Sequence, residues 1–209
     1  MRNRTVTLID LGLDEGFDHS MAFVQATLSN VNAGHNKPIV DVNFIRTRDL
    51  MTIQEALRTP STVLHVMAHG DHSEVPAFVS SDGKTQVTLD ALAERMLDDG
   101  YGVASPVVIA DGCKTGIGLW QRAIRNCLEG PITYVGTSAA VGWHDATVFC
   151  SAFYGALTRY KGAGVTAQDQ GLDAAQRAAE AFTTLTDRKS PFKAVELLPS
   201  RAAVKAMRR

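Results

Sequence analysis

The sequence is poor in cysteine and has no long hydrophobic run. Its 209 residues include three cysteines, Cys113, Cys127 and Cys150. An odd number without CxxC spacing predicts neither a disulfide framework nor a zinc ribbon, so we expect reduced thiols and a cytoplasmic protein. No segment is apolar over the roughly 18 residues that a membrane helix needs, and the start lacks a signal-peptide core. We therefore expect no contact with a membrane.

An excess of charge of either sign is also missing. Lys and Arg total 21 and Asp and Glu total 22, which gives a formal net charge of -1. Without a global basic excess, no nucleic-acid partner is expected. No Gly-x-Gly-x-x-Gly, P-loop or Gly-x-Ser-x-Gly pattern follows a predicted strand, which disfavours a nucleotide-binding domain and a small-molecule hydrolase.

The chain does have enough apolar residues for a sizeable core. Hydrophobic residues make up 45% of the sequence. The length suits a single domain over residues 1–209. No internal repeat, low-complexity stretch or interdomain linker interrupts this range, so the sequence predicts one compact unit.

Two short β-prone runs end alike. Residues 62–70 read Thr-Val-Leu-His-Val-Met-Ala-His-Gly, and residues 106–116 read Pro-Val-Val-Ile-Ala-Asp-Gly-Cys-Lys-Thr-Gly. Each is typical of a strand buried on both faces, and each stops at a glycine and a reactive side chain. If the strands are parallel in one sheet, His69 and Cys113 both emerge at its carboxyl edge, where open α/β sheets build their sites.

The rest of the chain alternates predicted strands and helices. Further strands are expected at residues 5–11, 39–45, 132–136 and 191–198, with a small surface hairpin within residues 76–87. Helices are expected at residues 18–31, 53–58, 88–98, 118–128, 145–160 and 166–186, the first capped by Asp18 and stopped by Gly34. A turn at residues 162–164 and a solvated basic tail at residues 202–209 complete the chain. The alternation predicts an α/β fold with a mainly parallel sheet covered by helices on both faces.

Cys113 and His69 offer the groups that a cysteine nucleophile needs. A Gly-flanked turn ahead of a predicted helix and a nearby imidazole both favour the thiolate of Cys113. His69 can protonate a departing amine. Gly70 lets its backbone N–H approach a carbonyl oxygen, and the N–H of Cys113 is a second donor, so these two residues form the expected oxyanion hole.

The other cysteines and histidines have simpler interpretations. Cys127 and Cys150 lie on predicted helix faces and are expected to be small buried hydrophobes. His65 lies inside a strand and is expected to be a core histidine with a satisfied hydrogen bond. His144 with Asp145 follows a strand end and could line the site, although a helix cap explains Asp145 equally well.

A metal site is not expected from the polar residues that follow the first of the two matched strands. The spacing of His69, Asp71 and His72 lacks a helical scaffold and a clear further ligand. We therefore predict no metal and no cofactor.

The two strand ends together resemble the caspase-like cysteine peptidases of clan CD, and the pattern is most similar to bacterial CHAT-domain proteases and metacaspases. The resemblance covers residues 62–157, including the strand at residues 132–136, the loop with Trp143 and the aromatic helix at residues 149–154. It implies a caspase-hemoglobinase fold, the catalytic dyad His69 and Cys113, and an oxyanion hole at Gly70 and Cys113.

Three departures qualify the resemblance. CHAT proteins often have alanine before the catalytic cysteine, where this chain has Gly112. No long insert lies between Cys113 and Ile132, so a two-chain mature form is not expected. Appended repeat or sensor domains are also missing, which implies regulation by a protein partner or by the N-terminal region.

Asp111 is the candidate specificity residue. Alternation along the strand points residues 111 and 113 to the same side, which puts the carboxylate beside the nucleophile. An incoming Arg or Lys would neutralise it through charge-assisted hydrogen bonds, and metacaspases, which this region resembles, cleave after basic residues. The alternative is that Asp111 pairs permanently with an internal base such as Lys114 or Arg122, or caps a loop.

These observations predict a site-specific cysteine endopeptidase that cleaves a protein substrate after Arg or Lys. The alternative is a catalytically silent caspase-like module that serves as a binding or scaffold subunit.

Overall fold

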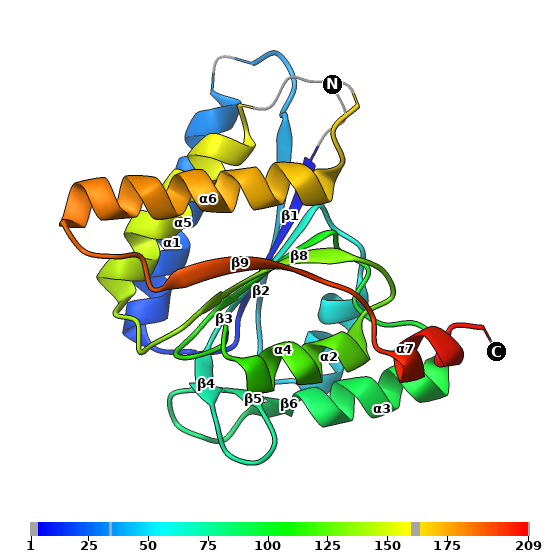
Figure 1. The fold of residues 1–209 in the computed structure, drawn as a ribbon. Helices are drawn as coiled ribbons and strands as arrows, with labels where there is room; N and C mark the ends of the chain where they lie inside the picture. The colour runs from blue at the N-terminus through cyan, green and yellow to red at the C-terminus, as the bar shows by residue number, and fades with distance from the viewer. Residues whose placement is uncertain (1–3, 34, 160–163, 209) are drawn as a thin grey trace.

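A six-stranded sheet forms the centre of the molecule, with strands in the order β2-β1-β3-β7-β8-β9 (Figure 1). The computed structural model describes residues 4–33, 35–159 and 164–208. The sheet strands are β1 (Arg4–Asp10), β2 (Val40–Arg46), β3 (Val63–Met67), β7 (Val107–Asp111), β8 (Ile132–Thr137) and β9 (Phe192–Leu197). Five are parallel, and β9 runs antiparallel to β8. The predicted mainly parallel sheet is confirmed.

Helices cover both faces of this sheet. They are α1 (Glu15–Asn32), α2 (Leu50–Arg58), α3 (Leu89–Asp99), α4 (Gly118–Ile124), α5 (Trp143–Leu157), α6 (Ala167–Thr186) and α7 (Arg201–Ala206), with a 3₁₀ turn η1 at Arg125–Cys127. One hydrophobic cluster joins α1, α5 and α6 to the sheet, and a second joins α2, α3 and α4 to its other face. Burial on both faces is what the uninterrupted apolar runs of β3 and β7 require.

The register of β3 and β7 brings the two matched strand ends together. Val63 pairs with Val107 and Met67 pairs with Asp111, so the strands end level with each other. All five residues of each strand are buried. The residues that follow, His69 and Cys113, therefore leave the sheet at the same carboxyl edge, as expected.

A second, three-stranded sheet lies beside this edge. It is antiparallel, with the order β4-β5-β6, and consists of β4 (His69–Asp71), β5 (Ala77–Val79) and β6 (Gln86–Thr88). The sequence predicts the hairpin of β5 and β6 but not the third strand. Because β4 pairs with β5, His69 is held by two adjacent sheets instead of projecting from a free strand end.

Several predicted boundaries need correction. Helix α1 begins at Glu15, because Asp14 and not Asp18 caps it by accepting a hydrogen bond from the Phe17 N–H. The predicted tail instead forms α7, which buries Ala203 and Ala206. The expected stop at Gly34 and most of the expected turn at residues 162–164 lie outside the described residues.

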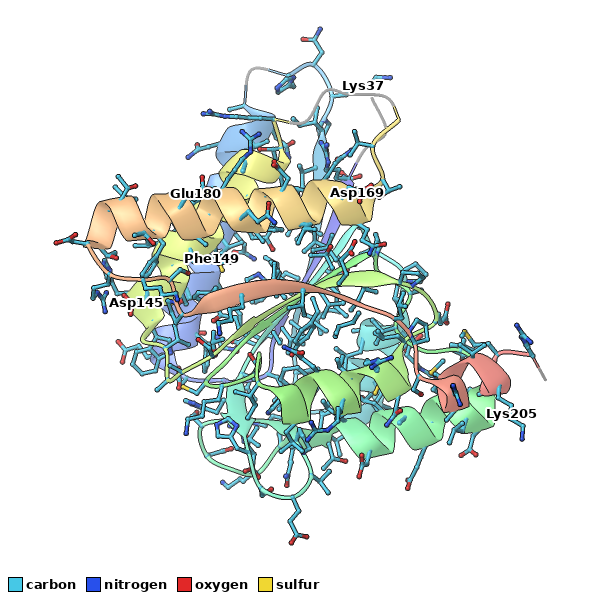
Figure 2. All side chains as sticks on the ribbon, in the orientation of Figure 1. Lys37, Asp145, Phe149, Asp169, Glu180 and Lys205 are labelled. Atoms are coloured by element: carbon cyan, nitrogen blue, oxygen red, sulfur yellow. The ribbon has the colours of Figure 1, made fainter. Side chains whose placement is uncertain are left out.

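Strand β9 closes one side of the sheet and is anchored to the helix layer. Phe192, at the start of β9, stacks on Phe149 of α5 with 4.1 Å between the ring centroids. Phe149 is labelled in Figure 2. Just before β9, the Pro191 carbonyl accepts hydrogen bonds from the N–H and hydroxyl of Ser138. This contact fixes the start of the loop that leads from β8 to α5.

Candidate active site

A pocket of about 240 Å³ opens at the carboxyl ends of β3 and β7. Its walls come from the ends of both strands and from α1, α5 and the loop before α5. The lining residues are Phe17, Ala68, His69, Asp111, Gly112, Cys113, Val141, Gly142, Trp143 and Ala146. Three of the four residues that the sequence singles out therefore line one cavity.

Hydroxyl groups of neighbouring residues hold the loop that follows β7 and carries Cys113. Thr115 donates to the carbonyl oxygens of Ala110 and Gly112, and Thr137 of β8 donates to that of Gly112. Tyr134 of β8 donates to the Thr115 carbonyl at 2.8 Å. These buried hydrogen bonds hold the turn rigid, so the thiol of Cys113 has a defined position at the pocket wall.

The thiol itself is half-buried and makes one weak contact. Its Sγ lies 3.8 Å from the carbonyl oxygen of Val141. No hydrogen bond joins it to His69 anywhere in the described part of the chain. Helix α4 begins only at Gly118, so the expected helix N-terminus directly behind Cys113 is separated from it by an irregular turn in which Lys114 has a φ of 54°.

Gly70 and Gly112 allow a close approach of two backbone segments. A Cβ atom added to Gly70 would lie 2.4 Å from the Cys113 carbonyl oxygen, and one added to Gly112 would lie 2.4 Å from the Ala68 carbonyl oxygen. Neither distance is compatible with a side chain. The close approach of the two strand ends therefore requires glycine at positions 70 and 112.

His69 is oriented by Asp14, a residue that the sequence analysis misses. The His69 Nε2 lies 3.2 Å from the Asp14 Oδ2. The imidazole also packs edge-on against Phe17, with 5.2 Å between centroids. Asp14 lies just beyond the carboxyl end of β1, so the rule that identified His69 and Cys113 as edge residues also applies to it.

The loop that carries Asp14 depends on the buried Asp10. Asp10 accepts a hydrogen bond from the Leu13 N–H at 2.9 Å, and its other oxygen lies 3.3 Å from the Arg46 guanidinium. Burial raises the pKa of Asp10, and this effect outweighs the opposite effects of Leu13 and Arg46. Leu13 itself adopts a φ of 56°, which turns the chain sharply toward His69.

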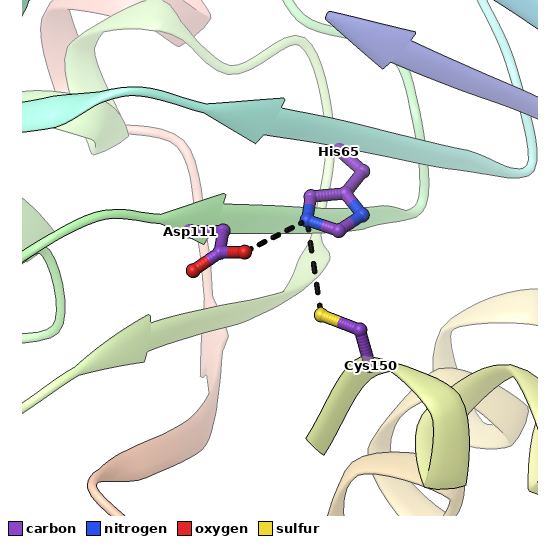
Figure 3. Close-up of side chains that lie close together, drawn as sticks. All are labelled: His65, Asp111 and Cys150. Atoms are coloured by element: carbon purple, nitrogen blue, oxygen red, sulfur yellow. Dashed lines mark hydrogen bonds and ion pairs between the residues drawn. The ribbon is translucent and has the colours of Figure 1, made fainter. Parts of the chain in front are cut away.

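Asp111 contacts a buried histidine behind the pocket. Its Oδ2 lies 3.6 Å from the Nε2 of His65, and Cys150 of α5 places its Sγ 3.9 Å from the same nitrogen (Figure 3). The Nδ1 of His65 is 3.0 Å from the Tyr154 hydroxyl, which confirms the expected core histidine with a satisfied hydrogen bond. Burial raises the pKa of Cys150 well above its ordinary value, and the Asp111 charge adds to the effect.

The partners that the sequence offers for Asp111 are not the ones found. Within the described residues no ion pair joins Asp111 to Lys114 or Arg122; its ionisable neighbour is the imidazole of His65. Gly70 does not line the pocket, but its backbone abuts Cys113.

The remaining candidates lie away from the pocket. His144 is exposed, and Asp145 pairs with Arg188 at 2.5 Å. Cys127, the last residue of η1, is buried against the start of α3, where its thiol lies 3.2 Å from the Leu89 carbonyl oxygen and burial raises its pKa to about 12. Both cysteines outside the pocket are therefore buried, as predicted.

The fold is similar to that of solved cysteine proteases. A secreted C11 cysteine protease from Bacteroides thetaiotaomicron, iotapain, superposes with a TM-score of 0.58 at 10% identity, over 94% of this chain and 67% of that one. A structure of a secreted C11 protease from the same organism with an irreversible peptide inhibitor gives 0.53 at 10% identity, over 88% and 60%. An inactive zymogen C11 protease from Parabacteroides distasonis gives 0.51 at 9% identity, over 88% and 60%.

These similarities identify the fold as the caspase-like fold of clan CD cysteine peptidases. No protein-family model matches the sequence, and no curated protein matches it. The chain spans 60 to 67% of the length of the three proteases. The closer relation to CHAT-domain proteases and metacaspases stays a prediction. Among the described residues, no helix is both long and apolar enough to cross a membrane.

Proposed function

We propose that this chain is a cysteine endopeptidase with Cys113 as nucleophile and His69 as general acid and base. One observation carries the proposal: a single pocket at the carboxyl edge of a caspase-like sheet is lined by Cys113, His69 and Asp111. The buried pair of His65 and Cys150 cannot take this role, because each is at most 1% exposed and no peptide bond can reach it.

In the proposed mechanism the thiolate of Cys113 attacks the carbonyl carbon of the scissile bond. The tetrahedral intermediate collapses to a thioester, and the departing amine takes a proton from the His69 imidazolium. His69 then accepts a proton from water, whose oxygen attacks the thioester carbonyl; the carbon–sulfur bond breaks, the product acid leaves, and the Cys113 thiolate and His69 imidazolium are restored. Asp14 supports this cycle by holding the imidazole in place from the Nε2 side.

The oxyanion would be stabilised by backbone N–H groups of Gly70 and Cys113. The N–H of Cys113 donates to no acceptor among the described residues. The missing side chain of Gly70 leaves space for the close approach of its backbone to Cys113. Both facts support this assignment.

The proposed substrate is a protein cleaved after Arg or Lys. Asp111 lines the pocket and accepts no hydrogen bond on its carboxylate from any described residue. A buried carboxylate with a single imidazole at 3.6 Å is poorly compensated, so a guanidinium that enters the pocket would gain charge-assisted hydrogen bonds. The planar fork of Arg favours it over Lys.

The dyad is tested by single substitutions. Cys113→Ala is expected to abolish turnover of a peptide substrate, and His69→Ala to reduce kcat by about 10²–10⁴-fold, the usual contribution of a general acid or base. Cys127→Ala is the matched control and should leave turnover largely intact. Normal turnover by Cys113→Ala would contradict the assignment of Cys113 as the nucleophile.

The specificity is tested with fluorogenic peptides that place Arg, Lys, Asp or Leu before the cleaved bond. Wild type is expected to prefer Arg, and Asp111→Ala to lose that preference while still reacting with a small thiol reagent. The assignment of Asp111 as the specificity residue would be wrong if wild type preferred Asp or Leu. It would also be wrong if Asp111→Ala kept full selectivity for Arg.

A catalytically silent binding module is the second candidate. It is favoured by the lack of a hydrogen bond between His69 and Cys113 among the described residues. Labelling with an acyloxymethylketone probe separates the two candidates. An active enzyme is labelled as wild type and is not labelled as Cys113→Ala, whereas a silent module is labelled in neither form. A regulatory protein partner and a cytoplasmic location stay predictions.

A further inference from the structure

Three side chains that are typical metal ligands meet in the interior of the molecule. His65 comes from β3, Asp111 from β7 and Cys150 from α5, and all three are buried. One ligand atom of each lies within 4.8 Å of the others (Figure 3). We propose that they form a binding site for a divalent transition-metal ion of the Zn²⁺ class, separate from the pair of His69 and Cys113.

The distances suit a small tetrahedral ion. The Nε2 of His65 lies 3.6 Å from the Asp111 Oδ2 and 3.9 Å from the Cys150 Sγ. Zinc bonds of about 2.0–2.3 Å place neighbouring ligand atoms roughly 3.3–3.7 Å apart in a tetrahedron. The His65 nitrogen is therefore within a few tenths of an ångström of tetrahedral spacing from both other ligand atoms, and those of Asp111 and Cys150, which lie within 4.8 Å of each other, close around the ion when it binds.

A hydrogen bond to its second ring nitrogen already orients His65. A metal-bound imidazole usually has its second nitrogen fixed by a polar neighbour, which sets the tautomer and the ring direction. Here the Tyr154 hydroxyl lies 3.0 Å from the Nδ1 of His65. When this hydroxyl accepts the Nδ1–H, the lone pair of Nε2 points toward Asp111 and Cys150.

Charge balance favours the same ligand. The Asp111 carboxylate accepts no hydrogen bond from the described residues, and a buried anion with only one imidazole beside it is costly. A dication bound by a carboxylate, a thiolate and a neutral imidazole forms a complex with no net charge. Binding breaks the S–H bond of Cys150, forms a metal–sulfur bond and releases the proton to solvent.

The pocket supplies the route and the fourth ligand. Asp111 also lines the 240 Å³ pocket, so an ion can enter from that side and complete its coordination with a water molecule. The bound ion would occupy the carboxylate that the proposed peptidase uses for a basic side chain. This consequence for substrate choice rests on the proposed function, whereas the metal site itself does not.

The test measures binding without turnover. Cys113→Ala protein, which lacks the catalytic thiol as a rival ligand, is titrated with Co²⁺ and followed by visible absorption. We expect one cobalt per chain, with the intense bands of tetrahedral cobalt and a thiolate-to-cobalt charge-transfer band. Adding Cys150→Ala should remove the charge-transfer band, and adding Asp111→Asn should weaken binding at least about tenfold.

The matched control is Cys127→Ala in the same background, because Cys127 is as buried as Cys150 but belongs to the hydrophobic cluster on the other face of the sheet. It should leave both bands unchanged. Absence of the charge-transfer band in Cys113→Ala protein, or its survival in the variant that also lacks Cys150, would overturn the proposal. If near-ultraviolet circular dichroism shows that the Cys150→Ala variant is unfolded, the Asp111→Asn variant is used instead. An unchanged cobalt affinity of the Asp111→Asn variant would also overturn the proposal.

Discussion

Asp14 combines two roles in one side chain. Its Oδ1 caps α1 by accepting the Phe17 N–H at 2.9 Å, while its Oδ2 contacts the Nε2 of His69 at 3.2 Å. The cap fixes the position of the carboxylate at the helix start, and the free oxygen then holds the imidazole. The orientation of His69 therefore depends on where α1 begins.

Replacing Asp14 by Asn separates these roles, because Asn also caps helices but carries no charge. We expect Asp14→Asn to lower kcat by more than about tenfold and by less than the 10²–10⁴-fold loss expected when the imidazole itself is removed. The measurement is kcat and KM with the preferred peptide. Asp49→Asn, at the N-cap of α2, is the matched control and should have no effect on kcat. Equal kcat for both variants would contradict a role of Asp14 in catalysis.

At the scale of elements, the meeting of the ends of β3 and β7 determines the geometry of the site. The loop after β7 is held by Thr115 and Thr137, and the chain after β3 turns at once into β4. The two segments touch through glycines, so their spacing leaves no room for a methyl group. A change of this spacing displaces Cys113 relative to His69.

Gly112→Ala is therefore expected to damage both stability and activity. A Cβ at this position would lie 2.4 Å from the Ala68 carbonyl oxygen, so the backbone must shift, at a cost of about 1–3 kcal/mol in the free energy of unfolding. With Cys113 as the proposed nucleophile, a displacement of about 1 Å there is expected to lower kcat/KM by about a hundredfold. Urea unfolding and peptide hydrolysis measure the two effects. Gly130→Ala has open space around its Cβ and should change neither.

The elements that bury continuous apolar runs were predictable from the sequence, and the candidate site only in part. The runs of β3 and β7 indicated both strands and the carboxyl edge at which His69, Asp111 and Cys113 line one pocket, because burial on both faces leaves a simple pattern. Strand β4 was missed because His-Gly-Asp has no β pattern and pairs only through tertiary contact with β5. Asp14 was missed because its partner is 55 residues away.

The cluster behind the pocket was beyond sequence reasoning for a similar reason. His65 and Cys150 were each interpreted correctly as buried, but 85 residues separate them and no local spacing links them. Only the packing of α5 against the sheet places the thiol beside the imidazole. Pattern analysis finds ligands that share an element, and here each ligand comes from a different one.

On the scale of the whole molecule, Asp10 couples global stability to pH. Its pKa is raised from the usual value of 3.8 because the carboxylate is buried under the loop after β1. The folded state therefore keeps the proton at a pH where the unfolded chain has already lost it. The resulting stabilisation is complete below about pH 3.8 and is lost as the pH rises through the pKa of the folded protein.

Comparison with Asp10→Asn isolates this contribution from that of the other carboxylates. The free energy of unfolding of wild type minus that of the variant is expected to decrease as the pH rises above 3.8, and to level off once Asp10 is ionised in the folded state. Urea unfolding at a series of pH values gives both curves. A difference that is independent of pH, or that increases with pH, would show that burial does not control the Asp10 carboxyl.

The glycine at position 112 also limits how the site can change one residue at a time. A Cβ at this position would lie 2.4 Å from the Ala68 carbonyl oxygen. Alanine fits here only after the ends of β3 and β7 have moved apart, so the order in which two substitutions are made decides whether Gly112→Ala is tolerated.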